Sequence, residues 1–333
     1  NKCVLCRRCV AACGAVQGIG VIGPVYRGFN TAIESPWNMP LVDMACINCG
    51  QCIAACPTGA LHEKDSTKEV WDLLADPKKH VVVQPAPAVR AALGEEFGLP
   101  IGTNVQGKMV AALRRLGFDG VFDTDFAADM TIMEEATEFL HRMKEGGPLP
   151  LITSCSPGWV KFCETYYPDM IPNLSSCKSP QQMFGAVMKT YFAEKIGKRP
   201  EDIYTVSVMP CVAKKAEREQ ELFYEEYAGH DVDAVITTRE LVKMMRSAHI
   251  SPETLRDIPG DSPMQEGTGA GVIFGVTGGV MEAALRTAYA VITGENPDAD
   301  AFEAVRSPGF NANEGVSEAE LTINGIRIRT AVV

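Results

Sequence analysis

Eight of the twelve cysteines lie within the first 56 residues, in two groups of identical spacing. Each group reads C-x2-C-x2-C-x3-C, and Pro57 follows the second group. In this pattern the first three thiolates of a group bind one 4Fe-4S cluster, and the fourth binds the cluster of the other group. The sequence therefore predicts two clusters. Their expected ligands are Cys3, Cys6, Cys9 and Cys56 for the first, and Cys46, Cys49, Cys52 and Cys13 for the second.

Two other uses of clustered cysteines fit this spacing less well. Structural zinc takes four ligands that come in pairs, not in doubled quartets. Disulfide frameworks are typical of small secreted domains, not of the start of a chain of 333 residues. We therefore expect residues 1–62 to form a separate domain of bacterial-ferredoxin type, and residues 63–79 to form a connector.

Two further cysteines follow apolar runs in the rest of the chain. Cys155 lies in the sequence TSCSPGW, and Cys211 lies in the sequence VMPCVAKKAE. Chemistry in open α/β sheets gathers at the carboxyl ends of the strands, which is where both thiols are expected. Lys214 comes three residues after Cys211, so that its ammonium can reach an anion bound beside a metal centre. Two unrelated buried thiols are the plainer alternative.

The elements that must position these residues alternate between strands and helices. We predict strands over 80–84, 120–126, 149–155, 203–211 and 232–238, and helices from Val89 onward and over 107–118, 130–146, 157–167 and 239–248. This alternation predicts an α/β domain with a mainly parallel sheet. Near the end of the chain, Asn324-Gly325 between alternating apolar runs predicts a β-hairpin.

Composition narrows the class of protein further. The chain is 46% hydrophobic and 22% charged, as expected for a globular protein with a substantial core. Its net charge of −11 argues against nucleic acid as a partner. It has no apolar run of about 18 residues, so we expect no membrane span. Because no signal peptide is visible we expect the cytoplasm, but Asn1 need not be the natural start, so the periplasm stays open.

Several longer strings resemble the iron–iron hydrogenases, over essentially the whole chain. They are TSCSPGW, MPCVAKKAE, APAVRAALGEEFG, DMTIMEEATEF, CKSPQQMFGA and GVIFGVTGGVMEAALR. The resemblance implies a two-lobed α/β H-cluster domain with mainly parallel sheets over residues 80–333, and the reversible reduction of protons to H2. It also implies the H-cluster, a 4Fe-4S cubane joined through a cysteine to a two-iron unit that carries CO, cyanide and a bridging dithiolate.

The same resemblance implies roles for individual residues. Lys214 and the backbone N–H of Ala88 would donate to cyanide, and Cys211 would ligate the cubane. The residues expected around the two-iron unit are Ala86, Pro87, Ser179, Pro180, Gln181, Met209 and Phe274. The residues expected to relay protons are Cys155, Glu135, Ser175, Glu138 and Arg142. Three of the relay residues are spaced i, i+3 and i+7, which places them on one face of one helix.

The chain departs from the family pattern in two places. The family loop reads T-S-C-C-P, in which the first cysteine relays protons and the second ligates the cubane, so Ser156 takes the ligand position here. Either Cys155 becomes the ligand, or Ser156 binds weakly, or the cluster is incomplete. We expect Cys155 to be the ligand, with a relay role alone as the alternative. The family's third motif, M-A-C-x-x-G-C, would follow Val333, and we expect it in a part of the protein beyond this sequence.

The expected partners are redox proteins. A ferredoxin would serve, as would flavin-bearing NAD(H) subunits or further iron–sulfur domains or subunits. Two other classes keep the same fold without hydrogen turnover: an electron-transfer or H2-sensing relative, and a relative used in iron–sulfur cluster assembly. The relay positions and Lys214 favour the enzyme.

Overall fold

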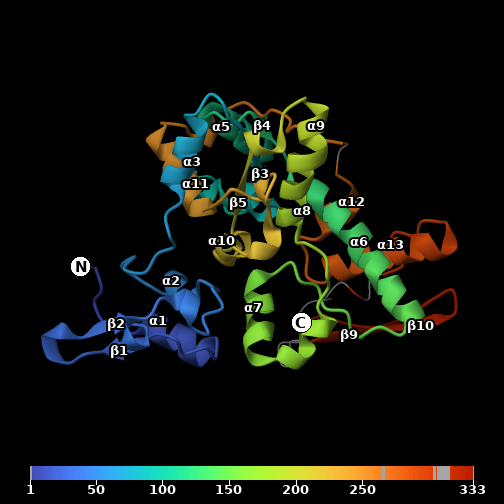
Figure 1. Ribbon diagram of the computed structural model, residues 1–333, viewed down its shortest axis with the longest axis horizontal. Helices are drawn as coiled ribbons and strands as arrows, with labels where there is room; N and C mark the ends of the chain where they lie inside the picture. Colours follow the sequence, from blue (N-terminus) through green and yellow to red (C-terminus); the bar gives the residue numbers. More distant parts are fainter. Residues whose placement is uncertain (1, 265–266, 303–304, 306–315, 333) are drawn as a thin grey trace.

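The computed structural model describes residues 2–264, 267–302, 305 and 316–332. Its centre is a four-stranded parallel sheet in the order β4-β3-β5-β8 (Figure 1). The strands are β3 (His80–Pro85), β4 (Gly120–Val121), β5 (Ile203–Met209) and β8 (Ala234–Thr237). These strands are rich in buried valine and isoleucine, as parallel strands covered on both faces should be. The predicted α/β class with a parallel sheet is therefore confirmed.

Helices cover both faces of this sheet. Successive residues of a strand face opposite sides, so Val81 and Val83 pack into one hydrophobic core and Val82 into another. The first core is closed by α3 (Thr67–Leu74), α4 (Pro87–Ala92), α5 (Gln106–Leu116) and α11 (Thr238–Ser247). The second is closed by α6 (Thr124–Glu145) and α8 (Pro180–Val187). The result is a three-layer arrangement with the sheet in the middle.

The long helix α6 links the sheet to a second lobe, at the lower right of Figure 1. Its far end packs against α13 (Gly279–Thr293) and against the hairpin of β9 (Ser317–Ile323) and β10 (Ile326–Val332). The turn residues Asn324 and Gly325 have φ angles of 47° and 80°, the left-handed conformation that a two-residue hairpin turn requires. The predicted hairpin is confirmed.

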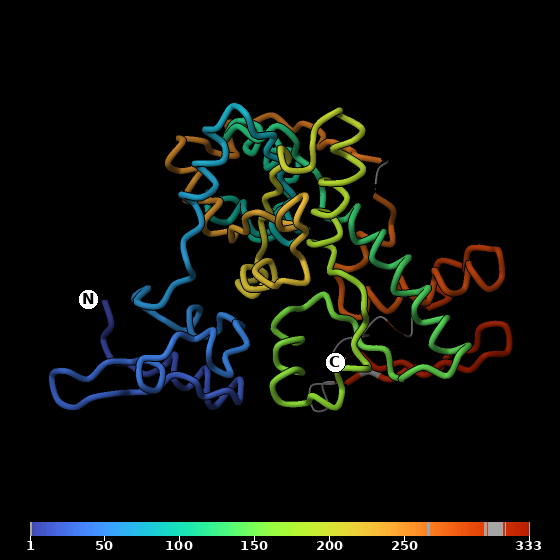
Figure 2. The backbone as a smooth tube through the Cα atoms, in the orientation of Figure 1, coloured from blue at the N-terminus to red at the C-terminus, as the bar shows by residue number. Residues whose placement is uncertain are grey.

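The cysteine quartets belong to a small unit that lies beside the rest of the molecule (Figure 2). It consists of short elements: α1 (Arg8–Ala11), β1 (Gly23–Val25), β2 (Ala32–Glu34) and α2 (Gln51–Ala54). An extended stretch of chain runs from this unit to α3. The remaining helices and strands are α7 (Pro157–Tyr166), α9 (Ala193–Lys195), α10 (Ala213–Arg218), α12 (Gly269–Ile273), β6 (Tyr224–Glu225) and β7 (Gly229–His230).

One predicted strand is absent, and another is shorter than predicted. Residues 149–155 form no strand; Ile152 makes only an isolated parallel bridge to Leu174. Pro148 and Pro150 lack the N–H groups that a strand ladder needs, which explains why the apolar run stays irregular. The second lobe therefore contributes an antiparallel hairpin, and no parallel sheet, to the described part of the chain.

The strand predicted over 120–126 is much shorter than expected, because a helix begins inside that range. β4 stops at Val121, and α6 starts at Thr124. Asp123 caps this helix by accepting a hydrogen bond from the backbone N–H of Asp125 at 3.0 Å. Among the described residues, no helix has the length and apolarity that crossing a membrane requires.

The close packing of α8 on the Asp231 loop gives a direct test of this fold. A Cβ atom built on Gly185 would lie 2.1 Å from the backbone oxygen of Asp231, so the backbone would have to move. Gly185→Ala should therefore lower the free energy of unfolding by about 1–3 kcal/mol in chemical denaturation. Gly269→Ala is the matched control, because no atom lies within 4 Å of its added Cβ. Equal stability of the two variants would contradict this packing.

Candidate active site

The site forms where three helices begin near the carboxyl edge of the sheet. Pro87, Pro157 and Pro180 each occupy the start of a helix, α4, α7 and α8 respectively. Proline suits this position because its fixed φ angle matches the helix and its missing N–H has no partner there anyway. The residues just before the three prolines, Ala86, Ser156 and Ser179, are extended. This turn from extended chain to helix brings the predicted residues together.

A buried carboxylate on α10 connects these segments. Glu217 accepts hydrogen bonds from the Ser179 hydroxyl at 3.0 Å and from the Gln181 side-chain amide at 2.9 Å. The main-chain oxygen of Gln181 accepts in turn from the buried side chain of Gln84 at the end of β3, at 2.9 Å. Strand β3, helix α8 and helix α10 are thus joined by one polar network.

Lys214 supplies the positive charge of this network. Its ammonium lies 3.0 Å from both carboxylate oxygens of Glu217 and donates to the main-chain oxygen of Cys155 at 2.8 Å. The two charged side chains are only 12% and 6% exposed. The two charges therefore form a buried ion pair. The ammonium also ties the loop after β5 to the TSCSPGW loop.

The other predicted cofactor-binding residues differ in burial and in position. Ala86 is buried, and its N–H donates to the main-chain oxygen of Val208 at 2.9 Å, which holds it beside β5. Met209 is also buried, but it is part of the first hydrophobic core. Ala88 is exposed, and Phe274 follows α12, at some remove in the sequence from the polar network. Among the described residues, Glu217 thus joins Ser179, Gln181 and Lys214, and Ala88 and Phe274 take no part in these hydrogen bonds.

Three of the predicted relay residues, Glu138, Arg142 and Ser175, are joined by hydrogen bonds beside α6. Glu138 accepts from the Ser175 hydroxyl at 2.9 Å and from the guanidinium of Arg142 at 2.5 and 3.0 Å. Arg142 also donates to the main-chain oxygen of Leu174 at 2.8 Å, which fixes the segment that carries Ser175. Burial alone would raise the pKa of Glu138, but the hydrogen bonds from Arg142 and Ser175 outweigh it and lower that pKa.

Glu135 lies one turn deeper on the same helix and is 3% exposed. Burial raises the pKa of its carboxyl to about 7, and the hydrogen bond with Ser175 lowers that pKa in part. Burial also raises the pKa of the Cys155 thiol, and the charge of Glu135 raises it further while that of Lys214 opposes the rise. Cys155 is thus within electrostatic reach of both the relay and the lysine.

Sequence reasoning missed two contributors to this site. Cys177 lies beside the relay, with its sulfur 3.7 Å from Glu138, and burial raises the pKa of its thiol to about 11. Glu217, the centre of the polar network, stands last in the string MPCVAKKAE. Its i, i+3 spacing from Lys214 is the signal that pointed to it.

The first cysteine group has the surroundings that iron–sulfur ligands need. Burial raises the pKa of Cys9, and the nearby thiols of Cys56 and Cys6 raise it further, so these three lie together. Backbone N–H groups of Leu61 and Thr58 lower the pKa of Cys56 to about 7, and the N–H of Ala60 donates to its sulfur at 3.2 Å. Hydrogen bonds of this kind stabilise the thiolate form that binds iron.

In the second cysteine group, thiols of both quartets lie near one another, although no three metal-ligating side chains of the described residues are close enough to hold a metal ion as they stand. Burial raises the pKa values of Cys46 and Cys52, and Cys49 and Cys13 raise both of them further. Cys13, the fourth residue of the first quartet, thus lies with the second, as Cys56 lies with the first. This arrangement fits two 4Fe-4S clusters.

The second group also lies against the candidate active site. A Cβ atom on Gly50 would lie 2.7 Å from the side chain of Val212, the residue after Cys211. A Cβ atom on Gly158, in the first turn of α7, would lie 3.4 Å from the main-chain oxygen of Ile47. The loop that carries Cys46 and Cys49 therefore touches both loops that carry the site cysteines.

The donor set fits the H-cluster only in part. Cys155 and Cys211 would offer two thiolates, whereas a cubane takes four protein or bridging sulfur ligands. Ser156 is exposed, and its side chain makes no capping hydrogen bond at the start of α7. Lys214, the expected donor to cyanide, fits the H-cluster better than the cysteine set does, because its ammonium is held in a buried polar network.

Comparison with known families defines the class of protein. Residues 79–333 match the family described as iron only hydrogenase large subunit, C-terminal domain, and residues 2–61 match the 4Fe-4S dicluster domain. The chain therefore belongs to the iron-only hydrogenase large-subunit family. The resemblance seen in the sequence is confirmed, as is the pairing of a 4Fe-4S domain with an H-cluster domain.

The particular relatives are hydrogenases. The chain is 52% identical to the NADP-reducing hydrogenase subunit HndD of Solidesulfovibrio fructosivorans, covering 97% of this chain and 55% of that protein. It is 47% identical to iron hydrogenase 1 of Clostridium pasteurianum, covering 100% of this chain and 57% of that protein. The chain thus spans little more than half the length of these relatives.

Comparison with solved structures supports the same family. The apo FeFe-hydrogenase HydA1 from Chlamydomonas reinhardtii is 44% identical and superposes with a TM-score of 0.67, covering 78% of this chain and 65% of that one. Cluster-assembly proteins are more distant: the cytosolic Fe-S cluster assembly factor narfl of Xenopus tropicalis is 32% identical, covering 80% of this chain and 59% of that protein. Similarity therefore favours the hydrogenases over the assembly class.

The raised pKa of Glu135 predicts a pH-dependent stability. A folded carboxyl that holds its proton up to about pH 7 loses stability relative to the unfolded chain as pH rises from 4.5 to 7. Glu135→Gln stays neutral, so its free energy of unfolding should exceed that of the parent by about 2–3 kcal/mol at pH 8. At pH 4 the two proteins should be equal. Chemical denaturation at both pH values measures this.

Glu134→Gln is the control for this experiment, because Glu134 precedes Glu135 on α6 but is exposed. Its free energy of unfolding should stay within about 0.5 kcal/mol of the parent at both pH values. A Glu135→Gln variant that shows the same difference from the parent at pH 4 and pH 8 would refute the raised pKa.

Proposed function

We propose that this chain is the electron-entry and catalytic portion of an iron–iron hydrogenase, which interconverts protons, electrons and H2. The observation that carries the proposal is that two lines of residues meet at the TSCSPGW and MPCVAKKAE loops. One is the second cysteine group, which touches Val212 and Gly158. The other is the buried polar row of α6, which reaches Cys155 electrostatically.

Electrons would travel through the amino-terminal unit. We assign residues 1–62 to this two-cluster domain, residues 63–79 to a connector and residues 80–333 to the catalytic domain. The cluster of Cys46, Cys49, Cys52 and Cys13 would be the one that passes electrons to the site. The contact of Gly50 with Val212 supports this order, because it leaves little protein between that cluster's loop and Cys211.

Protons would move along side chains of this chain alone. Arg142 orients the Glu138 carboxylate, whose Oε2 accepts the Ser175 hydroxyl, so a proton taken up at Glu138 can pass to Ser175 Oγ. Glu135 would carry it further, because a carboxyl with a pKa of about 7 can both accept and release a proton near neutral pH. Cys155 Sγ would then deliver it to the site.

The H-cluster, when bound, supplies the metal chemistry that joins protons and electrons into H2. Cys155 and Cys211 would hold its cubane, with Cys155 as a relay alone as the alternative. Lys214 would exchange part of its contact with Glu217 for a bound cyanide, in a pocket shared with Ala86, Pro87 and Gln181. Ser179, Pro180, Met209, Phe274 and Ala88 would complete the surroundings.

The proposed partners are redox proteins, in the cytoplasm or, as the alternative, in the periplasm. The similarity to a subunit named as NADP-reducing supports electron exchange with flavin-bearing NAD(P)(H) subunits. A ferredoxin is the other candidate, and it would contact the amino-terminal unit. Infrared spectra after anaerobic maturation test the function: bands in the CO and cyanide stretching region support a hydrogenase, and their absence supports an electron-transfer, sensing or assembly relative.

The relay assignment predicts a selective loss of turnover. Glu138→Gln removes a titrating group but keeps a side-chain oxygen, so H2 evolution should slow by about 10²-fold while the infrared bands stay unchanged. Glu134→Gln, on the exposed side of α6, should leave both unchanged. An unchanged rate of H2 evolution in Glu138→Gln would contradict the relay assignment.

The ligand assignment predicts opposite effects for two substitutions. Cys211→Ala should abolish the electron paramagnetic resonance signal of the site cubane, while both amino-terminal clusters remain visible. Ser156→Cys adds a thiolate, a better iron ligand than a hydroxyl, and should increase the iron held at the site. A site signal that survives in Cys211→Ala would show that the catalytic centre has been misplaced.

A further inference from the structure

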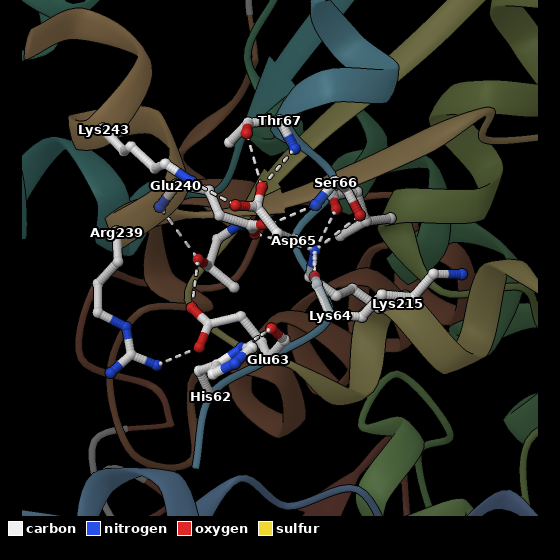
Figure 3. Close-up of polar contacts among 12 residues, drawn as sticks. His62, Glu63, Lys64, Asp65, Ser66, Thr67, Lys215, Arg239, Glu240 and Lys243 are labelled. Carbon is white, nitrogen blue, oxygen red and sulfur yellow. Dashed lines mark hydrogen bonds and ion pairs between the residues drawn. The ribbon is translucent and has the colours of Figure 1, made fainter. Parts of the chain in front are cut away.

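The connector between the cysteine quartets and the catalytic domain is held by a dense set of polar contacts (Figure 3). Residues 62–66 have no helix or strand of their own. They lie across the starts of α10 and α11, where charged side chains from both helices meet them. Most of these contacts join residues more than 140 positions apart in the sequence.

Lys215 is the centre of these contacts. Its ammonium donates to the main-chain oxygen of Lys64 at 3.0 Å and to the hydroxyl of Ser66 at 2.9 Å, both in the connector. It also donates to the main-chain oxygen of Val235 in β8 at 2.9 Å and lies 2.9 Å from the carboxylate of Glu240 in α11. The Lys215 side chain is 15% exposed, so these partners replace most of its water.

Glu240 joins the same contacts from the other side. One carboxylate oxygen accepts the backbone N–H of Ser66 at 2.7 Å, and the other accepts the N–H of Thr237 at 2.6 Å, which caps α11. The side chain is only 6% exposed. Because both charges of the pair are buried and hydrogen-bonded, removing either one would leave an uncompensated charge and release the connector.

The outer ion pairs of the connector are more exposed. Arg239 pairs with Glu63, and their side chains are 57% and 10% exposed. Lys243 pairs with Asp65, and their side chains are 60% and 46% exposed. Exposed pairs of this type contribute little to stability, because water and salt screen them. Of these ion pairs, the Lys215–Glu240 pair is the most buried.

Helix α10 also links this pair to the electron path. Lys214, the preceding residue, points to Cys155 and Glu217 in the site, and Val212 contacts the Gly50 loop of the second cysteine group. One short segment, 212–215, thus touches the connector, the cluster loop and the catalytic site. A shift of the connector on α10 would change the approach of the cluster loop to Cys211.

We propose that the Lys215–Glu240 pair is a positioning latch that docks the amino-terminal cluster unit on the catalytic domain at a fixed distance. Lys215 and Glu240 act through the connector and touch no reacting atom. The purpose of the latch rests on the proposed electron transfer, whereas the docking itself rests only on the contacts above.

Hydrogen exchange with mass spectrometry on the full chain, with its amino-terminal clusters loaded, tests the latch. In Lys215→Met the amides of residues 62–67 and 46–52 should exchange at least about tenfold faster than in the parent. Strand β5 should be unchanged, since a positioning role leaves the sheet intact. Lys215→Arg keeps the charge and should restore most of the protection, and Lys243→Met is the matched control that should have little effect.

Two results would overturn the latch. The first is unchanged exchange in the connector of Lys215→Met. The second is faster exchange of β5 and α11 to the same degree as the connector, which would mean that Lys215 stabilises the fold generally. If Lys215→Met does not fold, Glu240→Gln replaces it, because glutamine can still cap α11. Iron content and electron paramagnetic resonance test separately whether the proposed clusters are bound. The hydrogen-exchange comparison tests the docking of the connector, so the two failures can be told apart.

Discussion

The arrangement of the active site depends on one buried ion pair, Lys214 with Glu217. A single buried charge would be unstable here, and each charge has hydrogen-bond partners besides the other. Glu217 accepts from Ser179 and Gln181, and Lys214 donates to the main-chain oxygen of Cys155. Removal of one partner from such a pair typically costs about 3–5 kcal/mol. The loops of α7, α8 and α10 are therefore held together by residues of this chain. A charge that is already desolvated and oriented can bind an anion with little reorganisation.

Helix α10 gives this ion pair a wider role, because its two adjacent lysines point to different parts of the molecule. Lys214 faces the TSCSPGW loop, and Lys215 faces the connector. The loop just before the helix carries Cys211 and Val212, and Val212 packs on the cluster loop at Gly50. The polar residues of α6 reach the same region through Glu135, whose charge acts on the Cys155 thiol. In the proposed function, electrons and protons would thus approach one small region along different segments of the chain.

The parts of this molecule that could be predicted from the sequence are those with local causes. The cysteine spacing predicted the two groups because each tight loop brings three thiols together. The place of Cys13 and Cys56 with the opposite group came from the known ligand pattern of doubled quartets, not from a local contact. Helical periodicity placed Glu135 and Glu138 on one face of α6. The strand expected over 149–155 failed because a strand needs a neighbour as well as apolar residues, and prolines prevent that pairing. The i, i+3 spacing of Lys214 and Glu217 can indicate their ion pair, but the hydrogen bonds of Glu217 to Ser179 and Gln181, more than 30 residues away, have no local pattern.

The central claim is that Cys155 and Cys211, beside Lys214, hold an iron-containing cofactor next to the second amino-terminal cluster. Anomalous diffraction at the iron edge, from crystals of the anaerobically reconstituted chain, tests it directly. The account predicts three separate iron peaks: two among the eight amino-terminal cysteines and one beside Cys211, within reach of the Lys214 ammonium. Two amino-terminal peaks with no iron beside Cys211, in crystals where the Lys214–Glu217 pair is intact, would contradict it.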